Sequence, residues 1–396
     1  MKMTDVTQED IDYHRINSRL RPLEEIGYLC TKIGIDLIVD SEDFDCSARS
    51  TISISNFLRN SGCSNKLKYI KSGTTGHTFC VTWSHPENEK CSIPLAIKVV
   101  GYPKNKNYGD VDNNSRPENA EIRMLCILSD LVINGECEHI VLPFVAFKSP
   151  LGVFSSYKIP DSVDSYSVEK YVKFTEKIKE NKFHENSSIL ISEWCNGGDL
   201  SSFIKRHKGK ISEEAWRSIF FQIVFTLAKI QEKYPSFRHN DLKPNNILMN
   251  IFRKKSTESR KYALNGKTYT MPCPGFMIKI WDFDFASIDG KVDNVKLCQS
   301  WTKKMKIVKD QHRYYDLHYF FNTLSNRAFY PHLLEPGGAS HKVQKFVRRV
   351  VPLKYAKNKQ YVQGRTNRLC VVEEYTTPEI ILENDPFFAP FRSSAN

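Results

Sequence analysis

The stretch that most constrains this chain is the polar loop Phe237 to Met249, which reads Phe-Arg-His-Asn-Asp-Leu-Lys-Pro-Asn-Asn-Ile-Leu-Met. It follows an amphipathic run and precedes an apolar triplet, so we place it between a helix and a strand. Asp241, Lys243 and Asn246 are spaced two and three residues apart within it. A chance polar loop is a poor explanation for this spacing of acid, base and amide.

The bulk composition predicts a soluble chain with two lobes or domains. It has 396 residues, of which 40% are hydrophobic and 26% charged, and that length allows two separate cores. The 11 cysteines contain no Cys-x-x-Cys pair, which favours reduced thiols inside a cell over disulfides or zinc. The formal charge of +12 favours acidic partners such as phosphoprotein tails, nucleic acid or an anionic membrane surface. No specific nucleic-acid motif and no transmembrane segment are found.

A lysine in a strand-like run is the next candidate for chemistry. Lys98 lies among the apolar residues 95–100, and an unpaired buried charge is costly, so it needs an anionic partner. The following run has apolar residues at helical spacing. We expect the partner to be Glu121 and not Glu118, which would point roughly 60° away. Upstream, Gly73 and Gly76 are three residues apart between strand patterns and would let backbone approach a ligand closely.

The rest of the chain alternates ordered runs and polar insertions. Residues 1–65 carry no recognisable chemistry and form an N-terminal extension, and 150–187 and 250–275 are polar and basic insertions. A strand at 189–194 ends in a Gly-Gly turn. Ser212 is expected to cap a long helix whose apolar stripe is core: Trp216, Ile219, Phe220, Ile223, Leu227 and Ile230. A strand at 276–281 leads into Asp282-Phe283-Asp284.

The order of these motifs resembles that of eukaryotic-type protein kinases over residues 67–390. The loop at 239–246 matches their His-x-Asp-x-Lys-Pro-x-Asn catalytic loop. Asp282-Phe283-Asp284-Phe285 together with Tyr314-Tyr315-Asp316-Leu317-His318-Tyr319-Phe320 resembles the virion serine/threonine kinases of large cytoplasmic DNA viruses, of the poxvirus late-kinase type. The resemblance implies an α+β, bilobal fold, with a small β-rich N-lobe at 66–195 and a larger, mainly helical C-lobe at 196–396.

The resemblance also implies a role for each site residue. Asp241 would accept the substrate proton, Lys98 and Lys243 would offset phosphate charge, and Glu121 would position Lys98. Asn246 and Asp282 would bind Mg²⁺, or alternatively Mn²⁺, on the phosphates of ATP. The resemblance implies that Gly73 and Gly76 contact phosphate and that the backbone around Glu193 and Cys195 binds adenine. It implies that Asp199 contacts ribose or a basic substrate residue. It also implies that Asp316 binds the catalytic-loop backbone.

As a function, the resemblance implies a protein kinase that transfers the γ-phosphate of ATP to serine or threonine hydroxyls, with tyrosine as a further acceptor. Its substrates would be viral structural or assembly proteins, of acidic or membrane-associated character. The enzyme would work in the host cytoplasm and be packaged in the virion.

Three departures from the kinase pattern keep other classes open. Lys71 stands at the first glycine position, Asp284 replaces the last residue of Asp-Phe-Gly, and 287–313 contains no Ala-Pro-Glu. A pseudokinase scaffold and a small-molecule kinase of the aminoglycoside or choline type are the alternatives. The Lys-Pro after Asp241 favours protein substrates.

Two substitutions generate hypotheses about regulation and metal binding. Asn240 stands where many kinases have an arginine that pairs with a phosphate, so activity should not require phosphorylation of Ser287, Ser300 or Thr302. Asp284 should restrict the backbone and hold Asp282 inward, and its charge should raise cation affinity. The alternative is that Asp284 points to solvent or caps an amide.

Overall fold

The computed structural model describes residues 16–31, 33–39, 43–61, 63, 67–73, 75–85, 88–252 and 258–393. The chain divides into two compact units, 1–133 with 141–194, and 134–140 with 195–396. The division after Trp194 lies one residue from the expected boundary. The described part of 1–65 belongs to the first unit, and the sequence did not suggest that 134–140 belongs to the second.

The first unit is built on a five-stranded antiparallel sheet in the order β1-β2-β3-β5-β4. Alternating apolar residues such as Phe79, Ile97 and Ile191 are fully buried, as period-two patterning predicts. Its strands are β1 (Lys68–Ser72), β2 (His77–His85), β3 (Asn88–Pro103), β4 (Pro143–Pro150) and β5 (Phe183–Glu193). Its helices are α1 (Ile16–Thr31), α2 (Ile54–Asn60), α3 (Pro117–Ile133), α4 (Gly152–Ser155) and α5 (Ser165–Lys179).

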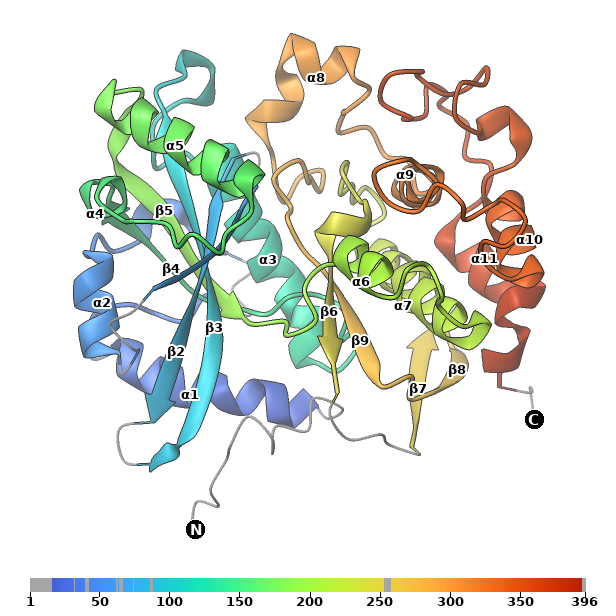
Figure 1. The fold of residues 1–396 in the computed structure, drawn as a ribbon, viewed down its shortest axis with the longest axis horizontal. Helices are drawn as coiled ribbons and strands as arrows, with labels where there is room; N and C mark the ends of the chain where they lie inside the picture. The colour runs from blue at the N-terminus through green and yellow to red at the C-terminus, as the bar shows by residue number, and fades with distance from the viewer. Residues whose placement is uncertain are drawn as a thin grey trace. The chain divides into compact units, whose positions relative to one another are not determined.

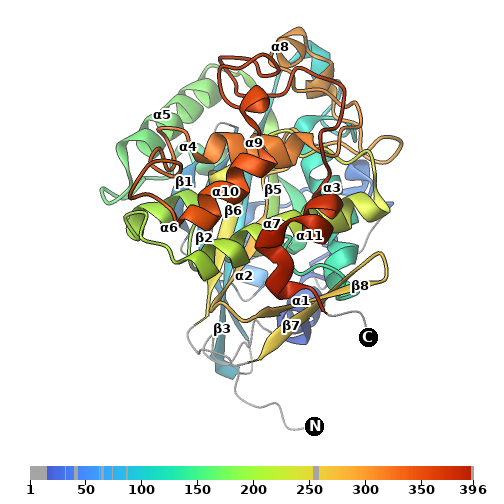
Figure 2. The same ribbon diagram turned by 90° about the vertical axis from the view of Figure 1, so that its right-hand side faces the viewer.

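The second unit is mainly helical. Its helices are α6 (Leu200–Arg206), α7 (Glu213–Lys233), α8 (Ser300–Lys304), α9 (Tyr315–Leu324), α10 (His341–Val350) and α11 (Pro378–Asn384). Helix α7 packs against α10 and α11, and α10 packs against α9 (Figure 2). Two short antiparallel pairs complete it, β6 (Ile247–Ile251) with β9 (Phe276–Ile280) and β7 (Ser259–Leu264) with β8 (Lys267–Pro272).

Helix α7 forms as its sequence predicts. The Ser212 hydroxyl accepts a hydrogen bond from the Ala215 amide at 3.1 Å, which satisfies one of the free amides of the first turn. All six residues of the predicted stripe are fully buried. The cap and the stripe are both confirmed, and the helix leads directly to the polar loop at 237–249.

The two predicted insertions contain regular structure. Much of 150–187 folds into α4 and α5, and α5 packs on β1 (Figures 1 and 2). The described part of 250–275 contains the β7–β8 hairpin; its basic residues Arg253, Lys254 and Lys255 lie outside the described residues. No helix within the described ranges is long and apolar enough to cross a membrane.

A buried ion pair joins the N-terminal extension to the rest of the first unit. Arg19 on α1 donates to both carboxylate oxygens of Glu193, with Nη2–Oε1 and Nε–Oε2 distances of 2.6 and 3.2 Å. The Glu193 carboxylate also accepts the Leu142 amide at 2.8 Å. A two-pronged arginine–carboxylate pair fixes orientation as well as charge, so α1 holds the end of β5 in place.

Breaking this pair should destabilise the first unit. Arg19→Met leaves the buried Glu193 charge without its main partner, at a cost of about 3–5 kcal/mol. Thermal and urea unfolding should show the loss. Arg59→Met, on an exposed site of α2, is the matched control and should change stability by less than about 0.5 kcal/mol. The double variant Arg19→Met/Glu193→Leu should recover much of the loss; equal effects of the two single variants would contradict the assignment.

Candidate active site

The first unit brings Lys98 and Glu121 together. Lys98 lies on the central strand β3, and its Nζ donates to Glu121 Oε1 on α3 at 2.6 Å. The two side chains are 7% and 5% exposed. Glu118, the alternative partner, instead accepts from Arg116. The pair therefore has the partner expected from helical spacing, and the catalytic role of both residues remains a prediction.

Helix α3 is held in place by the N-terminal extension. The Arg49 guanidinium donates to Asn119 Oδ1 and to the Tyr102 hydroxyl, both at 2.7 Å, and Nε donates to the Cys46 carbonyl at 3.1 Å. Asn119 lies two residues before Glu121 on the same helix. Residues that showed no recognisable chemistry in the sequence thus orient the helix that carries Glu121.

The glycine-containing turn lies beside Lys98. The Gly73 amide donates to the Gly76 carbonyl at 2.8 Å. A Cβ on Gly76 would meet Val100 Cγ2 at 3.0 Å and Lys98 Cε at 3.2 Å, so a side chain there would press on the lysine. This crowding gives a packing reason for glycine at position 76. Thr74 lies outside the described residues.

Helix α5 of the insertion contacts both ends of this turn. Ser72 donates its amide to Ser167 Oγ at 3.2 Å and its hydroxyl to the Ser167 carbonyl at 3.0 Å. His77, on the other side of the turn, packs its ring against Tyr171 and Phe174. Burial lowers the pKa of His77 to about 4, so it packs as a neutral ring at neutral pH. The insertion is part of the support for the glycine turn.

In the second unit, Asp316 organises the catalytic loop. This buried carboxylate accepts the His239 amide at 2.7 Å and the Asn240 amide at 2.8 Å. Asn240 has a left-handed backbone, with φ 64°, which asparagine tolerates better than most residues. The predicted contact of Asp316 with the loop backbone is confirmed.

Both oxygens of the Asp241 carboxylate are engaged. Oδ2 accepts from Lys243 Nζ at 2.5 Å and from Asn246 Nδ2 at 3.3 Å. Oδ1 accepts from Arg368 Nη2 at 2.7 Å and from the Tyr319 hydroxyl at 3.5 Å. The three residues of the sequence motif are therefore brought together, with Arg368 and Tyr319 added.

Arg368 is a site residue that the sequence did not reveal. It lies more than a hundred residues after the loop in a stretch without a motif, and no sequence signal could have found it. Its guanidinium also donates to the Asn240 carbonyl and to the Tyr315 hydroxyl, and it stacks over the Tyr319 ring. Burial alone would lower its pKa, but Tyr315, Tyr319 and Asp241 together raise the pKa of Arg368. It is a permanent cation beside Asp241.

Asn246 and Asp282 fit the predicted cation site in their donor atoms. Asn246 Nδ2 is engaged by the Asp241 carbonyl and carboxylate, so the amide oxygen is the atom that remains for a metal. The Trp281 amide donates to the Asn246 carbonyl at 3.2 Å, which places Asp282 next to Asn246. Asp282 has a left-handed backbone, with φ 67°. A carboxylate and an amide oxygen are ligands that hard divalent cations prefer.

The residues around the strand end have structural contacts of their own. Asp199 caps α6, its Oδ1 accepting the Ser202 amide at 2.8 Å, and Cys195 is buried. The Glu193 amide donates to the Leu142 carbonyl, and its side chain pairs with Arg19. The expected contacts of these residues with adenine and ribose remain predictions.

Asn240 ties the segment after Asp282 to the catalytic loop. Its Nδ2 donates to the carbonyl oxygens of Phe285 and Val308, each at 3.0 Å, and its Oδ1 accepts from Arg238 at 2.9 Å. Both ends of the segment 285–308 are thus held by one side chain. We call this arrangement the carbonyl clamp.

Of the expectations for Asp284, the one that its side chain points to solvent is wrong. The carboxylate is buried and pairs with Lys296, which also lies over the Phe285 ring. It therefore does not face solvent, and Lys296 offsets its negative charge; its effect on cation affinity stays a prediction. The pair joins two parts of the same segment, which is the restriction of the backbone that was expected, reached by another contact.

The two units together define a protein kinase, with the lysine–glutamate pair in one and the His-x-Asp loop with a neighbouring Asp-Phe in the other. Residues 161–378 match the family model described as poxvirus serine/threonine protein kinase. The chain belongs to this family and is a serine/threonine protein kinase, an enzyme class that uses ATP and a divalent cation. The pseudokinase and small-molecule alternatives are less well supported.

Individual relatives agree with this assignment. R400, a serine/threonine-protein kinase homologue of Acanthamoeba polyphaga mimivirus, is 44% identical over 83% of this chain and 69% of its own length. A shorter stretch is 43% identical to the ATG1a kinase of Arabidopsis thaliana, over 15% of this chain and 9% of the relative. Another is 35% identical to mouse haspin, over 27% of this chain and 13% of the relative. The viral similarity extends over most of the chain, and the others cover only part of it.

We expect activity without phosphorylation of the segment. Ser287 is buried and the Thr302 hydroxyl bonds to backbone carbonyls, whereas Ser300 is exposed. Phosphatase treatment and Ser300→Ala should leave turnover nearly unchanged, because the carbonyl clamp carries no charge. Asn240→Gly keeps the left-handed backbone but removes the clamp and should lower turnover by at least about tenfold, roughly 1.4 kcal/mol. A tenfold loss on dephosphorylation would contradict this prediction.

The Asp284–Lys296 pair predicts a second outcome. Asp284→Gly leaves a buried, unpaired lysine and should cost about 3–5 kcal/mol, measured by thermal unfolding. Asp284→Gly/Lys296→Met should restore stability. The Mg²⁺ and Mn²⁺ dependence of turnover in the double variant should match that of the wild type, because Lys296 already offsets the Asp284 charge. A weaker metal dependence in that variant would reinstate a role for Asp284 at the cation site.

Proposed function

We propose that this kinase phosphorylates serine and threonine hydroxyls of viral structural or assembly proteins, with tyrosine as a further acceptor. The observation that carries the assignment of roles is the environment of Asp241, whose carboxylate lies among Lys243, Asn246 and Arg368. A carboxylate positioned by several donors is suited to orient a hydroxyl and accept its proton. The viral character of the family and of its long relative supports substrates from virus assembly.

In the proposed reaction the substrate oxygen forms a bond to the γ-phosphorus, the bond to the β-phosphate oxygen of ATP breaks, and Asp241 accepts the hydroxyl proton. Lys243 offsets charge on the transferring phosphoryl group. Asn246 and Asp282 would hold Mg²⁺, with Mn²⁺ as the alternative; when bound, the cation offsets charge on the phosphates. Lys98, positioned by Glu121, would bind the phosphates of ATP.

The proposed roles rest on side chains that the fold supports from several sides. Glu121 is fixed through Asn119 by Arg49, and the glycine turn is fixed by α5. Such pre-positioning lowers the cost of ordering the site when substrate binds. We further propose that the enzyme acts in the host cytoplasm and is packaged in the virion, as expected for a kinase that modifies particle proteins.

Replacing the proton acceptor tests the roles. Asp241→Asn should lower phosphoryl transfer to casein or basic protein by at least about 10²-fold while ATP binding persists. Lys98→Met and Asp282→Ala should also be nearly inactive. Asp289→Asn, on an exposed site of the same unit, is the control and should keep full activity. Retention of more than about a third of turnover by Asp241→Asn would overturn its role.

Labelled ATP offered with proteins or with small alcohols separates the enzyme classes. Phosphorylation of protein alone is the expected result. Transfer only to small alcohols would indicate a small-molecule kinase, and ATP binding without any transfer would indicate a scaffold.

A further inference from the structure

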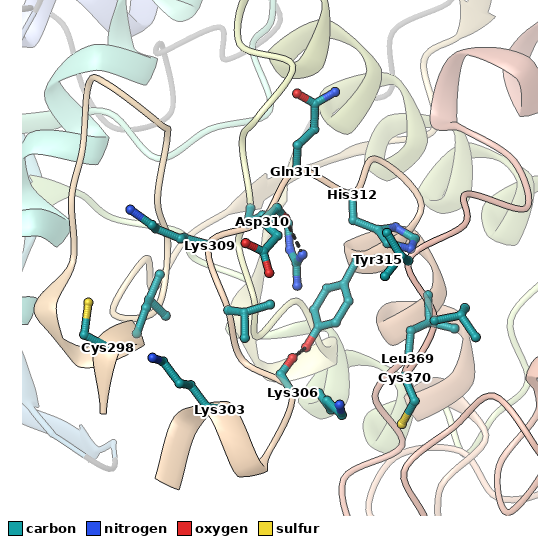
Figure 3. A pocket seen from close by; sticks show the side chains of 15 residues that line it. Cys298, Lys303, Lys306, Lys309, Asp310, Gln311, His312, Tyr315, Leu369 and Cys370 are labelled. Atoms are coloured by element: carbon teal, nitrogen blue, oxygen red, sulfur yellow. Dashed lines mark hydrogen bonds between the residues drawn. The ribbon is translucent and has the colours of Figure 1, made fainter. Parts of the chain in front are cut away.

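A cavity of about 580 Å³ lies in the second unit, beside the end of the segment 285–308 (Figure 3). Cavities of roughly 300–1,000 Å³ suit small ligands or a few inserted side chains. Its wall includes Leu297 and Cys298, the stretch 308–312, and the stretch 369–372. None of the roles assigned above uses it.

The wall of this cavity is strongly basic. Lys303, Lys306 and Lys309 line it, and Figure 3 labels all three among the lining side chains. Among the described lining residues the single acid is Asp310. A concave surface with one dominant sign of charge attracts ligands of the opposite sign more than isolated surface lysines do.

Three buried nitrogen atoms of two wall residues, His312 and Arg238, have no hydrogen-bond partner within the described residues. Neither ring nitrogen of His312 makes a hydrogen bond within the described residues, although the side chain is 95% buried, and Nε of Arg238 is also without a partner. Burial and the nearby Arg238 lower the pKa of His312, and the neutral ring still offers one N–H. Unsatisfied buried donors are costly, and a ligand with acceptor oxygens would satisfy them.

Two side chains, Tyr315 and Arg368, connect the cavity to Asp241. Tyr315 lines the cavity, and its hydroxyl accepts from Arg368 Nη1 at 3.1 Å. Arg368 Nη2 in turn donates to Asp241 Oδ1 at 2.7 Å. A polypeptide whose acceptor hydroxyl lies at Asp241 would thus have a neighbouring residue within reach of the cavity.

We propose that this cavity is a specificity site that binds an acidic side chain of the protein substrate, a carboxylate or a phosphorylated residue, within a few residues of the acceptor hydroxyl. The inference rests on the proposed function. Lys303, Lys306 and Lys309 supply the charge, and His312 and Arg238 supply hydrogen bonds. Val372, which is 89% exposed at the cavity, offers an apolar contact for the peptide beside the acidic residue.

A peptide series tests the site directly. Peptides with a single serine acceptor carry aspartate, phosphoserine, lysine or alanine at each flanking position in turn, and kcat/KM is measured with the full chain. Aspartate or phosphoserine at one or two positions should raise kcat/KM over alanine by about tenfold, as a charge-assisted hydrogen bond allows. The comparison of aspartate with phosphoserine distinguishes the two sources of negative charge.

Charge reversal separates recognition from folding. Lys303→Glu/Lys306→Glu/Lys309→Glu should lose the acidic preference and prefer the lysine peptide at the same position. The control Lys208→Glu/Lys261→Glu/Lys345→Glu changes three exposed lysines outside the cavity by the same charge and should keep the wild-type preference. Binding of the acidic peptide to Asp241→Asn, followed by fluorescence polarisation, should be weakened by the first triple substitution and not by the second.

Several outcomes would overturn the inference. A wild type that phosphorylates all peptides equally, or a control triple variant that loses the preference equally, contradicts it. Membrane docking would be indicated if no peptide preference is found and the cavity variant loses binding to anionic vesicles. This result would also contradict the inference. A wild type that phosphorylates no peptide or protein at all would instead contradict the proposed function.

Discussion

The arrangement of this kinase depends on one buried carboxylate. Asp316, at the start of α9, accepts two successive amides of the catalytic loop. Two hydrogen bonds to a buried charge are each worth more than a neutral pair, and together they stabilise the left-handed conformation of Asn240. That conformation directs the Asn240 side chain to the segment 285–308 and places Asp241 next, where Lys243 and Arg368 reach it. The positions of the Asp241 carboxylate and of the segment 285–308 therefore both depend on this contact.

The contacts within sequence motifs were predictable, and those between distant segments were not. Lys98 required an anion because it lies on a buried strand, and helical spacing selected Glu121. Asp241, Lys243 and Asn246 are close in sequence, so their chemistry could be read from spacing alone. Arg19, Arg49 and Arg368 each form hydrogen bonds with residues that lie far away in the sequence. An arginine in a stretch without a motif is normally a solvated surface residue. The pairing of Asp284 with Lys296 was also not predicted, because nothing in the local pattern indicated Lys296.

The extension and the insertion give the first unit a fixed form. Arg49 holds α3 through Asn119, Arg19 holds the end of β5 through Glu193, and Ser167 of α5 holds the base of the glycine turn. In many kinases the helix with the glutamate and the phosphate-binding loop are mobile, and regulation acts on their positions. Here both are tied by buried polar contacts to segments outside the motif set. Lys71 and Asp284, which replace glycines of the kinase pattern, thus lie in units that also contain additional buried contacts.

The carbonyl clamp also bears on which substitutions the segment 285–308 tolerates. Asn240 binds main-chain oxygens of Phe285 and Val308, and every amino acid supplies such an oxygen. These two contacts are therefore independent of the side chains of Phe285 and Val308, whereas a phosphate switch would need a serine or threonine at one place. Substitutions of the lysines at 303–309 would therefore leave these two main-chain hydrogen bonds in place while they change the charge of the cavity wall.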